Sequence, residues 1–152
     1  MREKMQIILD DMERYQESYA LWSVLFVRVK DICFPSHRWY DATSAVLSIW
    51  QQEIIRLISG SADCVRLPFM DGDYEIVLTR SDHEIVSAKL LMPDALAVWE
   101  GELDFIYFSR QLLSAVGKLR AYYSNNLDSP QMRELSSLAD RLRITMKEAT
   151  VN

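Results

Sequence analysis

The spacing of apolar residues changes near residue 64, and this change constrains the fold more than any other feature of the sequence. In residues 41–59 apolar side chains recur every three or four positions. From residue 65 they alternate with polar ones, in two runs that Asp71-Gly72 separates. Asp-Gly between alternating runs indicates a β-hairpin, since a type I′ turn needs positive φ at both central residues. We therefore expect a hairpin with Asp71-Gly72 as its two-residue turn.

The alternation continues beyond this hairpin. A second turn is expected at Ser81–His83 and a third at Pro93-Asp94, where turn-forming residues interrupt the apolar pattern. Residues 65–100 are thus predicted to form an antiparallel meander.

Three segments with the helical period flank the meander or follow it. They are residues 41–59, 104–124 and 129–147. Asp41, Asp104 and Ser129 are expected to cap their first turns, because a short polar side chain can accept a hydrogen bond from a free backbone N–H. Gly60 stands where a left-handed residue ends a helix. Trp50 lies on the apolar stripe of the first helix and is expected in the core.

The N-terminal third is less clear. Residues 5–15 fit a helix or a strand equally well by periodicity, whereas residues 21–34, rich in β-branched and aromatic side chains, favour a strand. Together with the meander and the helices, this predicts a single α+β domain over residues 1–152, with helices packed on an antiparallel sheet.

Composition limits the functional classes. The chain has 152 residues, a net charge of −5, two cysteines and no long apolar run. The acidic balance disfavours a nucleic-acid ligand. Two cysteines do not make a disulfide framework and suit a reducing compartment. Neither a signal peptide nor a membrane span is expected, so the sequence predicts a cytoplasmic protein with no membrane partner.

The negative charge is concentrated in residues 64–108, which hold nine acidic and three basic residues, a net charge of −6. A solvated surface is the ordinary explanation for such a segment. The alternative is an acidic face that binds a basic protein partner, because complementary potentials accelerate encounter and select the partner. The candidate partner-binding residues are Asp71, Asp73, Glu100, Glu102 and Asp104.

Catalytic and metal sites find little support in the residues. The four glycines are scattered and form no phosphate-binding loop. A zinc site would have to combine Cys33, His37, Cys64 and His83, of which just the first two are close in sequence. A thiolate–imidazole pair can be drawn from the same residues, but no motif marks a nucleophile. We expect no cofactor, no bound metal and no enzymatic activity.

The order of several short motifs resembles a group of small bacterial immunity proteins found beside polymorphic toxins, including those of contact-dependent growth inhibition systems. The motifs are Phe34-Pro35 at a strand end, Trp39 and Asp41 before an amphipathic helix that contains Val46–Trp50, and the later segment Phe69–Ile76. The resemblance covers roughly residues 20–110. It implies that the N-terminal segment is a strand, so that an N-terminal hairpin joins the central meander in the sheet.

The resemblance also implies a non-catalytic function. Such proteins bind and neutralise a cognate secreted toxin domain, often a nuclease with a basic cleft, inside the cytoplasm. No contact residue follows from it; the five acidic candidates come from the charge pattern alone. Two alternatives stay open: an adaptor or homo-oligomeric structural protein whose C-terminal helices form a dimer seam, and a small hydrolase. We expect a monomer or a weak dimer in the absence of a partner.

Overall fold

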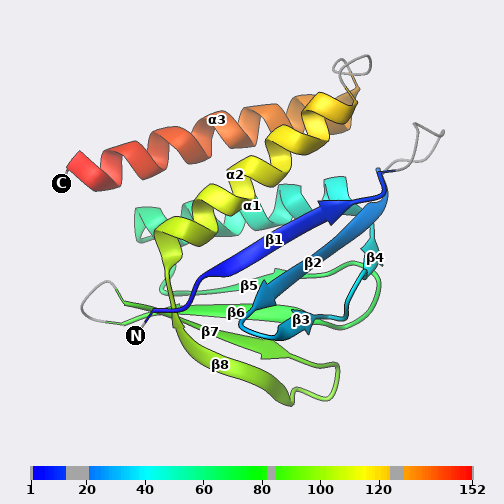
Figure 1. Cartoon of the computed structure of the whole chain (residues 1–152). Coiled ribbons are helices and arrows are strands. Elements are labelled where there is room, and N and C mark those ends of the chain that lie inside the picture. Colours follow the sequence, from blue (N-terminus) through cyan, green and yellow to red (C-terminus); the bar gives the residue numbers. More distant parts are fainter. Residues whose placement is uncertain (1, 13–20, 82–84, 124–128, 152) are drawn as a thin grey trace.

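The computed structural model describes residues 2–12, 21–81, 85–123 and 129–151. Within these ranges the chain forms three helices and two four-stranded antiparallel sheets, which is the predicted α+β class (Figure 1). The strands are β1 (Met5–Asp10), β2 (Ser23–Val29), β3 (Ile32–Phe34), β4 (Tyr40–Asp41), β5 (Cys64–Pro68), β6 (Glu75–Arg80), β7 (Val86–Leu91) and β8 (Ala97–Leu103). The helices are α1 (Thr43–Ser59), α2 (Phe105–Tyr122) and α3 (Pro130–Val151).

The first sheet is built by the N-terminal third of the chain. β2 pairs antiparallel with β1, with Ile7 opposite Val27, and also pairs with β3 and with the short β4. Residues 5–10 are therefore a strand, as the resemblance implied. The rest of the ambiguous segment, residues 13–15, lies outside the described residues. Alternate side chains of β1 (Met5, Ile7 and Leu9) are buried, which is the period of a strand with one face in the core.

The second sheet is the predicted meander, with its strands in chain order β5-β6-β7-β8. The N-terminal hairpin belongs to the other sheet, so the single sheet expected for hairpin and meander is in fact two. The last strand extends to Leu103, beyond the expected limit. Pro93-Asp94 does lie in the turn before β8, where the Met92 N–H donates to the Leu96 carbonyl at 3.0 Å. The turn predicted at Ser81–His83 falls mostly outside the described residues, although Ser81 and Ile85 close it with a 2.8 Å backbone hydrogen bond.

The prediction of a two-residue type I′ turn at Asp71-Gly72 is wrong. The bonded pair that closes the hairpin is Phe69 and Tyr74, whose N–H and carbonyl are 3.0 Å apart, so four residues, Met70–Asp73, form the connection. Gly72 has a φ of +119° within it. We call this connection the 70–73 loop. It is wider than a type I′ turn because two of its N–H groups bind a side chain from elsewhere in the chain, Asp41.

The same carboxylate explains an error in the helix caps. Asp104 does accept from the Tyr107 N–H at 3.0 Å, and Ser129 accepts from the Met132 N–H at 3.3 Å, as predicted. Gly60 ends α1 with a φ of +82°. Asp41, however, does not cap α1: the N-cap residue is Ala42, which makes no side-chain capping bond.

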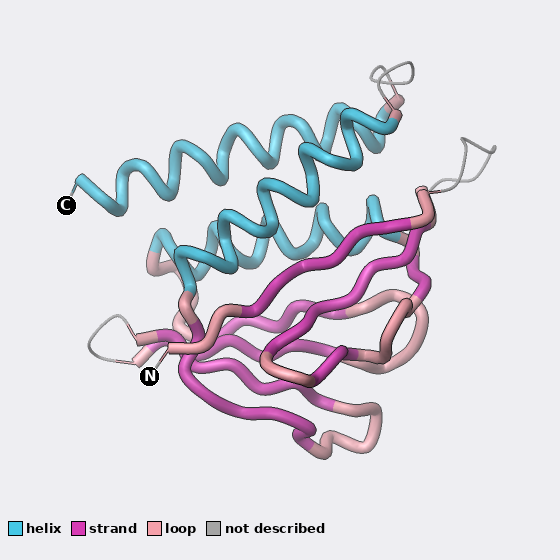
Figure 2. Tube along the Cα trace, in the orientation of Figure 1, coloured by secondary structure: helices cyan, strands magenta, loops and turns pink. Residues whose placement is uncertain are grey.

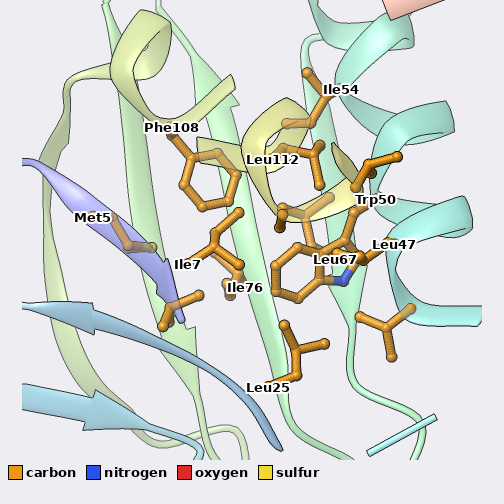
Figure 3. Packing of buried hydrophobic residues seen from close by; sticks show 14 of the residues in the cluster. Met5, Ile7, Leu25, Leu47, Trp50, Ile54, Leu67, Ile76, Phe108 and Leu112 are labelled. Carbon is orange, nitrogen blue, oxygen red and sulfur yellow. The ribbon is translucent and has the colours of Figure 1, made fainter. Parts of the chain in front are cut away.

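The helices lie together on one side of the strands (Figure 2). α1 packs on β5, α2 packs on β1, and α3 packs mainly on α1 and also on α2. One apolar cluster joins both sheets to the helices (Figure 3). At its centre Trp50 is fully buried, as expected, and its Nε1 donates to the Pro68 carbonyl at 2.8 Å. Full burial of an indole is tolerated there because its one polar atom has a partner.

Candidate functional site

A buried carboxylate organises the end of the second sheet. Asp41, the last residue of β4, is 0% exposed. Its oxygens accept from the Met70 N–H at 3.1 Å and from the Asp71 N–H at 3.2 Å. They also accept from Trp39 Nε1 at 3.0 Å and from the Ala42 N–H at 2.7 Å. A buried charge is tolerated only when hydrogen bonds replace its lost water, and here four donors do so. We call Asp41 and its donors the Asp41 cluster.

Aromatic side chains surround this cluster. The ring of Phe34 meets those of Phe69 and Tyr74 edge to face, with centroids 5.8 and 5.9 Å apart. Trp39 meets Tyr74 in the same manner at 5.0 Å. Edge-to-face pairs at these separations are favourable in addition to the burial of their area. The aromatic rings exclude water from the carboxylate and fix the position of the 70–73 loop.

The residues that carry the resemblance are thus neighbours in space. Phe34, Trp39, Asp41 and the segment Phe69–Tyr74 come from three separate parts of the sequence, yet each contacts another member of the group. Their shared role is structural, because together they hold one surface loop in a defined shape.

Gly72 is required by that shape. A Cβ added to it would lie 3.1 Å from the Tyr74 ring, and its φ of +119° belongs to a region that residues with side chains rarely adopt. The loop therefore combines one position that only glycine fits with the two N–H groups that Asp41 binds.

The predicted binding residues occupy three separate places. Asp71 and Asp73 are exposed on the 70–73 loop, at one end of the second sheet. Glu100 and Glu102 are exposed on the outer face of β8, where the Glu100 carboxylate is 3.9 Å from Lys89 Nζ. Asp104 is half-buried at the other end of β8 and caps α2. The first four remain available to a partner, whereas Asp104 is already engaged in the fold.

A hollow of about 360 Å³ lies beside the 70–73 loop, between it and the turn that joins β7 to β8. Its lining mixes apolar side chains with two carboxylates, in Pro68, Phe69, Gly72, Asp73, Tyr74, Glu75, Leu91, Met92, Pro93 and Ala95. Several large apolar side chains are exposed nearby in sequence, namely Met70 (42%), Leu96 (64%) and Val98 (41%). Exposed apolar side chains with polar groups around them have the arrangement of a protein interface, in which an apolar centre has a polar rim.

The candidates for metal binding and catalysis do not converge in the part of the chain that the structure describes. Within residues 2–12, 21–81, 85–123 and 129–151, no group of three or more His, Cys, Asp and Glu side chains could hold a metal ion. Cys33 is half-buried and Cys64 exposed, both as free thiols. His37 is exposed and its ring packs on Phe26, with centroids 5.6 Å apart. His83 lies outside the described residues.

One carboxyl group away from the loop has a shifted pKa. The hydrogen bond from the Asp11 N–H, followed by that from Arg38, lowers the pKa of Asp10 below its ordinary value. Asp10 is exposed at the end of β1, so this shift reflects a surface contact and does not mark a catalytic acid.

The sequence did not predict the structural role of Asp41. Its position before a helix favoured a cap, because capping is a local interaction and depends on residues two or three positions away. The partners it binds instead are 29 and 30 positions further along the chain. The one signal that linked them was the ordered set of motifs in the resemblance.

Comparisons with protein-family models, with curated proteins and with solved structures produced no match to this chain. Among the helices that the structure describes, none is both long enough and apolar enough to cross a membrane.

Proposed function

We propose that this chain is a non-catalytic immunity protein, which binds and neutralises a cognate secreted toxin domain in the cytoplasm. The observation that carries the proposal is the convergence of the resemblance motifs on the Asp41 cluster. Motifs that were short and scattered in the sequence form one structural unit, which holds a loop with an exposed methionine and two exposed aspartates. A unit that fixes a surface loop so firmly is typical of a preorganised binding surface.

Electrostatics supports a basic partner. The exposed acids of the 70–73 loop and of β8 belong to the segment whose net charge is −6. Many toxins of this kind are nucleases, whose clefts are basic because they bind phosphates. An acidic inhibitor would meet such a cleft with complementary charge, which raises the association rate and discriminates against other partners. Two free thiols are also in keeping with a reducing compartment.

The alternative of a dimeric structural protein receives less support. Its predicted seam was formed by the two C-terminal helices. In α3 most of the apolar stripe is already buried against the rest of the chain, namely Leu135, Leu138, Ala139 and Leu142, and Met146 is partly buried. Among the described residues, the large apolar side chains that these two helices still expose are Ile106 (52%) and Tyr122 (48%) of α2 and Ile144 (57%) of α3.

Co-expression tests the proposal. The toxin domain encoded beside this gene should arrest growth when produced alone and should be harmless when produced with this protein. The pair should co-purify in a one-to-one ratio. Persistent toxicity together with no complex, or a neighbouring gene that encodes no toxin, would contradict the proposal.

Paired variants locate the surface. Asp71→Lys with Asp73→Lys should weaken protection, whereas Glu134→Lys, an exposed acid on α3, serves as the matched control and should not. Thermal melts must accompany both, so that a loss of protection is not confused with unfolding.

A further inference from the structure

The edge strands of the two sheets differ in how far other segments bind their outward backbone groups. β1 is an edge strand of the first sheet, and its outward backbone groups are bound by side chains of α2. The Ile7 N–H donates to Gln111 Oε1 at 3.1 Å, and Lys118 Nζ donates to the Leu9 carbonyl at 2.5 Å. A helix therefore closes this edge, as native proteins commonly do to prevent unwanted strand pairing.

β8 is an edge strand of the second sheet and is closed at one end only. The Glu3 N–H donates to the Glu102 carbonyl at 2.9 Å, and the Asp104 N–H donates to the Glu3 carbonyl at 2.8 Å, which makes a single parallel bridge. The outward backbone groups of β8 thus belong to Glu102, whose carbonyl the Glu3 N–H binds, and, by the alternation of a strand, to Glu100. A register irregularity opposite Leu90 and Leu91 interrupts this alternation at Ala97 and Val98. In the described part of the chain, no strand pairs with this edge between Val98 and Gly101.

The exposed side chains along this edge have a regular pattern. Val98, Glu100 and Glu102 lie on one face of β8, and all three are exposed. The strand opposite them offers Lys89 beside Glu100, at 3.9 Å, but Ser87 beside Glu102. The β7 residue directly opposite Glu102 is therefore not a cation.

We propose that the open edge of β8 is extended by a strand of the partner protein, an extended segment with lysine or arginine at alternate positions. Main-chain hydrogen bonds to Glu100 would supply part of the affinity, and cations that reach the carboxylates of Glu100, beside the added strand, and of Glu102, at its end, would supply selectivity. The inference rests on the proposed function in one respect, that this partner is the toxin domain.

Charge argues against a second copy as the occupant. Two copies of β8 paired antiparallel about a two-fold axis at Gly101 would place Glu100 opposite Glu102. An axis at Glu100 would place that residue opposite its own copy. Like charges directly opposite each other destabilise a sheet. In these two registers the glutamates oppose the pairing of identical chains, whereas they would attract a basic strand.

A peptide titration tests the edge without any toxin. The probe is an end-blocked hexapeptide of alternating lysine and valine, added to the whole protein at up to roughly 10 mM, a range in which weak contacts become visible. Amide NMR signals of β8 should shift, and hydrogen exchange at the Glu100 N–H group should slow. The same peptide with glutamate in place of lysine is the matched control and should shift nothing.

Two further measurements separate strand pairing from simple charge attraction. The lysine peptide N-methylated at alternate residues keeps its charge but cannot pair along that edge, so it should lose the protection from exchange. The double variant Glu100→Lys, Glu102→Lys should weaken peptide binding about tenfold or more, from the two reversed cross-strand pairs.

Three results would overturn the proposal: no shift at β8, equal protection from the methylated peptide, or concentration-dependent shifts at β8 in the protein alone, which would identify a second copy as the occupant. The outcome is independent of the co-expression test. Protection from the toxin without peptide binding would support the proposed function but show that the toxin binds at a surface other than the β8 edge. Peptide binding without protection of cells from the toxin would support the open edge as a binding site and exclude the toxin as its partner.

Discussion

Two loops at the same end of the second sheet differ in what holds them. The 70–73 loop is bound through its N–H groups by Asp41, a buried carboxylate of the other sheet. The turn between β7 and β8 is held by its own residues: the Ala95 N–H donates to the Met92 carbonyl at 2.8 Å, and the Leu96 N–H donates to Asp94 Oδ1 at 3.1 Å. The first loop depends on the whole fold, the second on its local sequence.

This difference predicts a difference in rigidity. A loop bound to a buried group can move only if that group loses its hydrogen bonds, whereas a turn with local, exposed bonds can open by itself at low cost. The 70–73 loop is therefore the preorganised side of the hollow, and the β7–β8 turn is the side that can adjust to a partner.

The largest effect is expected from Asp41→Ala. The change leaves four N–H groups without their acceptor, three of them on the backbone, and we expect a loss of about 3–5 kcal/mol in the free energy of unfolding. Urea unfolding measures it. Asp41→Asn keeps one carbonyl oxygen and should lose less. If Asp41→Ala cost no more than the variants of the β7–β8 turn, the contrast between the two loops would be incorrect.

Gly72→Val should have the next largest effect, a loss of roughly 1–3 kcal/mol, because the valine would be strained at a φ of +119° and would press on the Tyr74 ring. Gly117→Ala is the matched control. A Cβ at Gly117, within α2, meets no atom within 4 Å, so alanine should stabilise the helix by about 0.5–1 kcal/mol. Equal thermal melts for wild type and Gly72→Val would contradict the loop geometry.

Asp94→Ala should cost about 0.5–1 kcal/mol, since it removes one exposed hydrogen bond that water can replace. Hydrogen exchange at the Leu96 N–H should accelerate, while exchange at the Met70 and Asp71 N–H groups should not change. Acceleration at both loops would mean that they move as one unit.

The smallest effect on stability is expected from charge reversal on the exposed side chains of either loop. Asp71→Lys should stay within about 0.5 kcal/mol of wild type, and Asp94→Lys should cost no more than Asp94→Ala, with which it shares the lost hydrogen bond to the Leu96 N–H. The two variants should differ in their association rates with the toxin domain, and Asp71→Lys should slow association more than Asp94→Lys. A charge in a fixed position steers a partner more effectively than one on an adjustable turn. Equal salt-dependent rates for the two variants would remove that distinction.

The same contrast, between structure held by local residues and structure held by distant ones, separates what could be predicted from the sequence from what could not. The helices, the meander and the caps at Asp104 and Ser129 depend on local periodicity and short-range hydrogen bonds, and these predictions are confirmed. The shape of the 70–73 loop could not be predicted, because the group that determines it is about 30 positions away in sequence. A local turn pattern indicated a hairpin correctly and its geometry incorrectly.

The same contrast between local and distant interactions applies to the candidate site. Exposure of Asp71, Asp73, Glu100 and Glu102 was predictable from alternation and from turn position. The open edge of β8 was not, since it depends on which segments lie beside the strand after folding. The bridge from Glu3, about 100 positions earlier in the chain, has no signature in the local pattern.

The closure of β1 by α2 has a consequence for the protein while it is being synthesised. Gln111 and Lys118 follow their backbone partners by 104 and 109 positions. At about 5–20 residues per second, a ribosome needs roughly 5 to 20 seconds to add that length of chain. Throughout that interval the nascent β1–β2 hairpin presents an edge that the finished protein covers, so other strands can reach this edge until α2 emerges.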